Sequence, residues 1–205
     1  MEKILQKKMT KLKRNFYNQK TIKVARAILG KFLVRKIGGK ILAGKIVETE
    51  GYVGPRDRAS HASRGKTART TLMFGPPGYA YVYLVYGLNY CFNVVTECEN
   101  YPAAVLIRAV EPVDGIDLMR RHRRVPEDDR NLTNGPGKLC QALKIDKKLN
   151  GADLAGNVLW IEDRGLKIKS SDVVSAKRIG VDYARQYKNK PWRFYLRGNP
   201  FVSKP

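Results

Sequence analysis

The chain has 205 residues, of which 43% are hydrophobic, and this is the size and composition of a single globular domain with a substantial core. It carries 40 Lys and Arg against 18 Asp and Glu, which gives a formal net charge of +22. So large a positive excess disfavours an enzyme of cationic metabolites. It favours a polyanionic partner such as nucleic acid, because each phosphate that Lys or Arg neutralises releases a counterion.

Residues 1–20 hold seven Lys or Arg and a single acid, Glu2, with few hydrophobic residues. This composition predicts a flexible basic arm that would add sequence-independent attraction to DNA, or else a surface helix. A solvated tail fits equally well. We expect the remaining residues, 21–205, to form one domain.

Residues 21–30, TIKVARAILG, have apolar side chains at helical spacing and predict a short helix capped by Thr21. The next two apolar runs, residues 32–37 and 41–50, predict strands joined by a tight Gly38-Gly39 turn. This hairpin carries a pair of acids near the end of its second strand.

The two acids, Glu48 and Glu50, would share one face of that strand with Ile46 and Tyr52, because side chains alternate. Their Cα atoms would lie about 7 Å apart. A metal site is disfavoured, since no histidine or third carboxylate is close in sequence. A basic surround keeps a carboxylate ionised, ready to activate water or stabilise a cationic sugar. We expect one of the two to be catalytic; the alternative is that both are only partners for arginines.

A long loop follows over residues 53–77, with five basic residues and one acid between Gly54 and Thr71. His61 lies in this loop, outside any apolar stripe. Such a histidine can be a base, a hydrogen-bond donor or a stacking plane, or it can simply satisfy its own loop.

Residues 79–85 and 90–96 predict a tyrosine-rich hairpin, and residues 103–112 predict the next strand of an antiparallel meander. Tyr81 is best explained as an amphipathic core residue. Tyr86 stands at the hairpin tip, where its aromatic ring would be exposed to solvent unless a binding partner buries it. We therefore expect it to be a wedge that fills the gap left by an extruded nucleotide in a duplex.

The rest of the chain predicts short elements and no repeat. They are helices at residues 114–124, from Pro136 onward and around 182–188, and strands at 158–162, 174–180 and 192–198. The fold class is therefore α+β.

Metal chemistry and a membrane location are both disfavoured. Cys91, Cys98 and Cys140 show no CxxC spacing, and with two histidines they make no zinc set. The N-terminus lacks a signal-peptide core, and no apolar run approaches the roughly 18 residues of a membrane span. We expect a reducing, intracellular compartment.

Several blocks in order resemble the alkyladenine (3-methyladenine) DNA glycosylases of the mammalian type, which bacteria also carry. The blocks are ARAILGKFLVR, IVETEGYVGPRDRASHAS, YVYLVYG with CFN, LIRAVEP, GPGKLCQAL and RFYLRGNPFVS, and they run from about Ala25 to Ser203. The resemblance implies one mixed α/β domain around a curved antiparallel sheet, with the tyrosine hairpin protruding.

The resemblance also implies the centre of a reaction site. The family's general base falls on Glu50, which would deprotonate the water that attacks C1′ of the deoxyribose, and Glu48 would be structural. Arg108 falls near that water. Tyr52 and Tyr83 would stack on the two faces of the flipped base.

Three further positions complete the implied site. His61 would contact the base and the adjoining phosphate, and Asn93 would disfavour guanine by meeting its 2-amino group. Tyr86 would be the minor-groove wedge. One departure is Asn89, which stands where some members carry an aromatic residue. Another is the loop from Glu97 to Pro102, which is longer and more acidic than the resemblance implies.

The implied activity is monofunctional hydrolysis of alkylated and deaminated purines from double-stranded DNA, which leaves an abasic site in base excision repair. It needs no cofactor and no metal. We expect a monomer, in the cytoplasm with the nucleoid if bacterial and in the nucleus if eukaryotic. The alternatives are a non-catalytic basic nucleic-acid-binding protein with stacking tyrosines and an RNA-modifying enzyme. The segment from 46 to 61, with its paired acids, Tyr52 and His61, favours the glycosylase over the non-catalytic binder.

Overall fold

One antiparallel sheet organises the chain in the computed structural model, which describes residues 9–124 and 129–204. The strands are β1 (Thr10–Lys11), β2 (Phe32–Ile37), β3 (Lys40–Val53), β4 (Ala80–Val85), β5 (Asn89–Val95), β6 (Ala103–Asp114), β7 (Leu159–Asp163), β8 (Val173–Ala176) and β9 (Arg193–Leu196). The helices are α1 (Arg14–Tyr17), α2 (Thr21–Ala27), α3 (Ile116–Arg123) and α4 (Pro136–Ala142). The predicted α+β class is confirmed. Within the described ranges, no helix is both long and apolar enough to cross a membrane.

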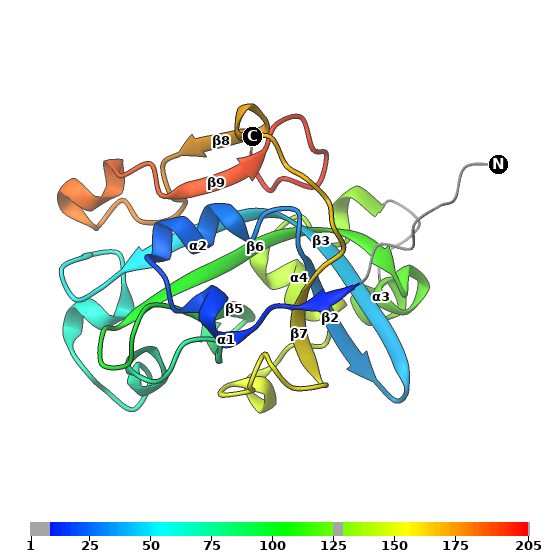
Figure 1. Cartoon of the computed structure of the whole chain (residues 1–205), viewed down its shortest axis with the longest axis horizontal. Coiled ribbons are helices and arrows are strands. Elements are labelled where there is room, and N and C mark those ends of the chain that lie inside the picture. The colour runs from blue at the N-terminus through cyan, green and yellow to red at the C-terminus, as the bar shows by residue number, and fades with distance from the viewer. Residues whose placement is uncertain (1–8, 125–128, 205) are drawn as a thin grey trace.

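The strand order is β1-β7-β2-β3-β6-β5-β4, with β9 pairing the second half of β3 and β8 pairing β9. The predicted meander is therefore present as β4-β5-β6. Helix α2 lies in front of β3 and β6, and α4 packs behind the sheet against β5 and β6 (Figure 1). Because helices cover both faces, β6 is buried continuously from Ala103 to Val110.

Both predicted hairpin turns form. Gly38 and Gly39 have φ values of +52° and +78°, a left-handed pair that glycine adopts without a Cβ clash. In the second hairpin Val85 pairs with Asn89 around a three-residue loop, in which Tyr86 itself has a φ of 49°.

Two bulges shape the centre of the sheet. The β3–β6 pairing passes from Ile46–Val110 to Glu48–Ala109 and then to Thr49–Ile107, so that Val47 and Arg108 each lie between pairs. The first bulge interrupts the alternation expected between Ile46 and the acids, and it leaves both Ile46 and Val47 in the main hydrophobic core. The second directs Arg108 toward the acids.

The described part of the predicted basic arm packs on the domain. Thr10 and Lys11 pair with β7, and Tyr17 is buried in the core. The prediction for residues 1–8 lies outside the described residues.

The acidic loop after β5 has a structural role at the start of α2. Thr21 is the first helical residue and not the cap, which is Lys20. The Glu97 carboxylate accepts hydrogen bonds from the Thr21 N–H and hydroxyl, at 3.0 and 2.7 Å. A carboxylate at this position satisfies a free N–H and complements the helix dipole.

Two elements near the C-terminus are shorter than expected. The strand predicted over residues 174–180 ends at Ala176, and the helix predicted around 182–188 is a 3-10 helix at Arg185–Asn189. Residues 177–181 leave the sheet instead and reach the candidate site.

Candidate active site

A cavity of about 420 Å³ opens between the β4–β5 hairpin, the loop before β4 and the segment after β8. It contains six of the seven residues predicted from the sequence: Tyr52, His61, Tyr83, Tyr86, Asn93 and Arg108. These residues are up to 56 positions apart in sequence, and the fold brings all six to one cavity.

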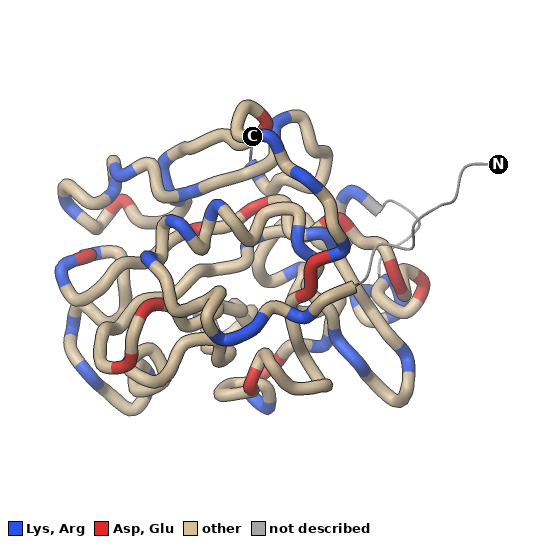
Figure 2. The backbone as a smooth tube through the Cα atoms, in the orientation of Figure 1, with Lys and Arg blue, Asp and Glu red and all other residues tan. Residues whose placement is uncertain are grey.

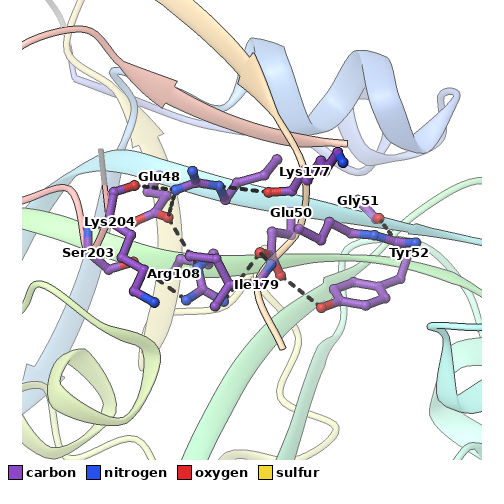
Figure 3. A network of polar contacts seen from close by, with 11 residues as sticks. Glu48, Glu50, Gly51, Tyr52, Arg108, Lys177, Ile179, Ser203 and Lys204 are labelled. Atoms are coloured by element: carbon purple, nitrogen blue, oxygen red, sulfur yellow. Dashed lines mark hydrogen bonds and ion pairs between the residues drawn. The ribbon is translucent and has the colours of Figure 1, made fainter. Parts of the chain in front are cut away.

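The seventh residue, Glu50, is fully buried and contacts three residues of the cavity wall. The Tyr52 hydroxyl donates to its Oε2 at 2.8 Å, and Arg108 Nη1 lies 3.3 Å from its Oε1. The backbone N–H of Ile179 donates to the same Oε1 at 2.8 Å (Figure 3). These three donors hold the Glu50 carboxylate against the wall of the cavity.

Tyr52 remains a donor in this arrangement. Its pKa lies well above the ordinary value, because burial disfavours the phenolate and the Glu50 carboxylate repels it. The phenol therefore stays protonated at neutral pH, and its O–H points to Glu50.

Glu48 lies on the same side of β3 and shares Arg108 with Glu50, but its other partners are different. Its Oε1 accepts from Arg108 Nε at 3.1 Å and from Arg193 Nη1 at 2.9 Å, and its Oε2 accepts the Ser203 N–H at 2.7 Å (Figure 3). Glu48 is outside the cavity lining and ties β3, β6, β9 and the C-terminal segment together. Arg108 bridges the two acids.

His61 and the hairpin tyrosines form an aromatic cluster in the cavity wall. The His61 and Tyr83 ring centroids are 4.5 Å apart at an interplanar angle of 78°, and His61 Nδ1 lies 3.1 Å from the Tyr81 hydroxyl. Burial, reinforced by the charges of Arg69 and Arg64, lowers the pKa of His61 to about 4. The imidazole is therefore neutral at pH 7, and Tyr81 is both a core residue and its hydrogen-bond partner.

Asn93 lines the cavity and is fixed by a hydrogen bond to the neighbouring strand. It is buried, and its Nδ2 donates to the Tyr81 carbonyl oxygen at 3.1 Å. One side-chain donor is thus satisfied by the hairpin itself.

The hairpin tip is exposed, and Asn89 at its base is docked. Tyr86 is 94% exposed and Leu88 79% exposed. The Asn89 Oδ1 accepts from Gln141 Nε2 of α4 at 3.2 Å, and a Cβ at Gly137 would lie 2.9 Å from the Asn89 side chain. Asn89 therefore fastens the hairpin to α4.

A second concavity of about 550 Å³ adjoins the cavity and is strongly basic. Its wall contains Arg58, Arg64, Arg69 and Arg185, and it shares His61 and other residues with the cavity. The two segments that supply these arginines lie at the same end of the molecule (Figure 1), and both carry Lys or Arg along the backbone (Figure 2). We call this concavity the arginine groove.

Sequence reasoning missed several residues here. Arg69 lines both concavities and stacks 5.0 Å from the Tyr83 ring centroid, and only the basic composition of its loop pointed to it. Tyr183 is 67% exposed and lines both the cavity and the arginine groove, but no sequence pattern pointed to it. No pattern pointed to the Ile179 N–H either. A backbone donor cannot be read from residue type.

Comparison with known proteins gives a single family. The family model of methylpurine-DNA glycosylase (MPG) matches residues 15–200. A relative from Alkaliphilus oremlandii is 50% identical over 95% of this chain and 99% of its own length. A relative from Desulfitobacterium hafniense is 49% identical over 95% of this chain and 99% of its own length. A relative from Methanocella arvoryzae is 50% identical over 96% of this chain and 97% of its own length. All three are named "Putative 3-methyladenine DNA glycosylase".

Proposed function

Because the chain belongs to the methylpurine-DNA glycosylase family, we propose that it is a 3-methyladenine DNA glycosylase of base excision repair. It hydrolyses the N-glycosidic bond of alkylated purines in double-stranded DNA. The observation that carries the proposal is Glu50, a buried carboxylate held by three donors at the edge of an aromatic cavity.

The reaction uses the cavity to bind the extruded base and Glu50 to activate water. Alkylation at N3 or N7 makes the purine cationic and a good leaving group, and the rings of Tyr52 and Tyr83 attract such a cation. Glu50 takes a proton from the water that attacks C1′ while the bond from C1′ to the purine nitrogen breaks. The electron pair of that bond leaves with the purine, and the strand keeps an intact backbone with an abasic sugar.

The neighbours of Glu50 have defined parts in this proposal. The Tyr52 O–H and the Ile179 N–H orient the carboxylate, and Arg108 lies beside the water. Neutral His61 contacts the base and the adjoining phosphate without adding repulsion toward a cationic purine. Asn93 disfavours guanine by meeting its 2-amino group.

The duplex lies across the hairpin tip and the arginine groove. Extruding a nucleotide costs a few kcal/mol, least at a damaged base. Tyr86 fills the vacated space in the stack, and phosphates next to the extruded nucleotide lie in the groove, where Arg58, Arg64 and Arg185 neutralise them.

Product analysis on one duplex tests this function. The substrate carries a single 3-methyladenine, and we expect a free purine and an intact strand that breaks only on alkali treatment. A matched undamaged duplex is the control. Binding without base release would support the non-catalytic alternative, and base release from RNA but not DNA would support the RNA-modifying one.

A further inference from the structure

Next to the cavity, Arg178 and Asp57 form a fully buried ion pair. Arg178 Nη1 and Nη2 donate to the two Asp57 oxygens at 2.6 and 2.8 Å, and both side chains are 0% exposed. Nη1 also donates to the Gly51 carbonyl at 2.9 Å. A buried pair of this kind adds little net stability over apolar packing, because desolvation offsets the attraction between the charges. Its contacts therefore invite a functional explanation.

The guanidinium of Arg178 lies between two aromatic rings. Its central carbon is 4.8 Å from the Tyr52 ring centroid and 5.1 Å from that of Trp192. Tyr52 lines the cavity, whereas Arg178 lies outside the cavity lining. The guanidinium thus packs on Tyr52 from the protein side, and the ring has a rigid backing on which a base could stack.

The same pair controls the surroundings of Tyr52 and Glu50. Asp57 accepts the Val53 and Ala59 N–H groups, each at 3.1 Å, and so fixes the loop that runs from Tyr52 toward His61. Arg178 directly precedes Ile179, whose N–H donates to Glu50. Because Asp57 and Gly51 hold the Arg178 guanidinium, they also fix the position of the neighbouring Ile179 N–H.

We propose that Arg178 is a positioning residue of the reaction, which acts through Tyr52 by holding its ring, and hence its hydroxyl on Glu50, in the working orientation. This inference rests on the proposed function, which assigns Tyr52 to the extruded base and Glu50 to the attacking water. Arg178 touches neither the substrate nor the attacking water.

A double-mutant cycle on the rate of base release tests this role. Arg178→Gln alone would leave a buried Asp57 charge unpaired, so Asp57→Asn/Arg178→Gln replaces the ion pair with a neutral hydrogen-bonding pair. The rate is measured at saturating enzyme in a single turnover, so that DNA affinity does not enter. We expect the neutral pair to lower the rate about tenfold with Tyr52 intact and less than twofold in the Tyr52→Leu background, because neighbours that act as a unit are not additive.

A purely structural pair would give the opposite result. The rate would then fall by the same factor in both backgrounds, or stay unchanged in both, and either outcome would overturn the proposal. The matched control is Arg164→Gln. Arg164 also stacks on a ring, 4.4 Å from the Phe32 centroid, and also pairs with acids, but lies outside the cavity lining. We expect it to leave the rate unchanged.

The ring itself supplies a readout that does not depend on catalysis. In tyrosine-labelled, DNA-free protein we expect the Tyr52 ring resonances to show slow ring flipping in the wild type and fast flipping in Asp57→Asn/Arg178→Gln. Unchanged flipping would contradict the proposal even if the variant lost activity. If the wild type released no purine, the proposed function would fail, while this measurement would still decide whether Arg178 holds the ring.

Discussion

Glu48 and Glu50 are the same residue type, two positions apart on one side of β3, and they belong to different regions of the molecule. Glu48 receives two guanidinium groups and a backbone N–H, all from elements that it ties together. Glu50 receives a phenol, a backbone N–H and one more distant guanidinium, all three from residues of the cavity wall. The first region joins strands to the C-terminal segment, and the second borders the proposed active site.

The difference shows that the partners of a buried acid, more than its burial, separate the two uses. Both carboxylates are fully buried. Two arginines pair with Glu48, whereas Glu50 meets one arginine, the protonated phenol of Tyr52 and a backbone N–H. Changes around Glu50 should therefore alter activity, and changes around Glu48 should alter stability.

The largest effect is expected for Glu50→Gln. The amide cannot accept a proton from water, so the single-turnover rate of base release should fall on the order of 10³-fold. Affinity for lesion DNA, measured by fluorescence anisotropy, should stay within about twofold, since the amide is nearly isosteric. Normal excision by this variant would show that Glu50 is not the base.

Glu48→Gln should give the complementary result. It leaves Arg193 and Arg108 without their shared carboxylate, so the free energy of unfolding in urea should fall by about 3–5 kcal/mol. Among molecules that remain folded, base release should fall far less than in Glu50→Gln. If Glu48→Gln lost as much activity as Glu50→Gln and kept its stability, the division between a structural Glu48 and a catalytic Glu50 would be wrong.

Tyr86→Ala tests the exposed end of the site. Because an aromatic stack is worth about 1–3 kcal/mol, affinity for lesion DNA should fall about tenfold. Binding to undamaged duplex, and its dependence on salt, should change little, since phosphate contacts carry it. Equal losses on both duplexes would indicate plain stacking or a damaged fold.

The smallest effect concerns His61 and pH. Its pKa in the folded protein is about 4, against about 6.5 in the unfolded chain, so the unfolded state binds the proton first as pH falls. His61 should therefore reduce stability progressively between pH 6.5 and pH 4. His61→Gln should lessen the drop in Tm between pH 7 and pH 5, and a drop equal to that of the wild type would show that His61 does not contribute.

Local patterns and the family resemblance predicted much of this arrangement. The Gly38-Gly39 pair and the alternating tyrosines predicted the two hairpins, and the resemblance assigned seven site residues, six of which line one cavity. The roles of those residues stay predictions. Bulges were not predictable, because the extra residues Val47 and Arg108 depend on how two distant strands pair.

By itself, then, the sequence determined the types of the central elements, the basic charge and the placement of both acids on one strand, since these follow from residue type and short-range periodicity. Only the tertiary structure decided that the partners of Glu50 all line the cavity, whereas most of those of Glu48 do not. The donors that distinguish them, Ile179 for Glu50 and Arg193 for Glu48, stand 129 and 145 positions further along the chain. Their approach depends on the pairing of β9 with β3 and on residues 177–181 leaving the sheet, and no local pattern encodes either.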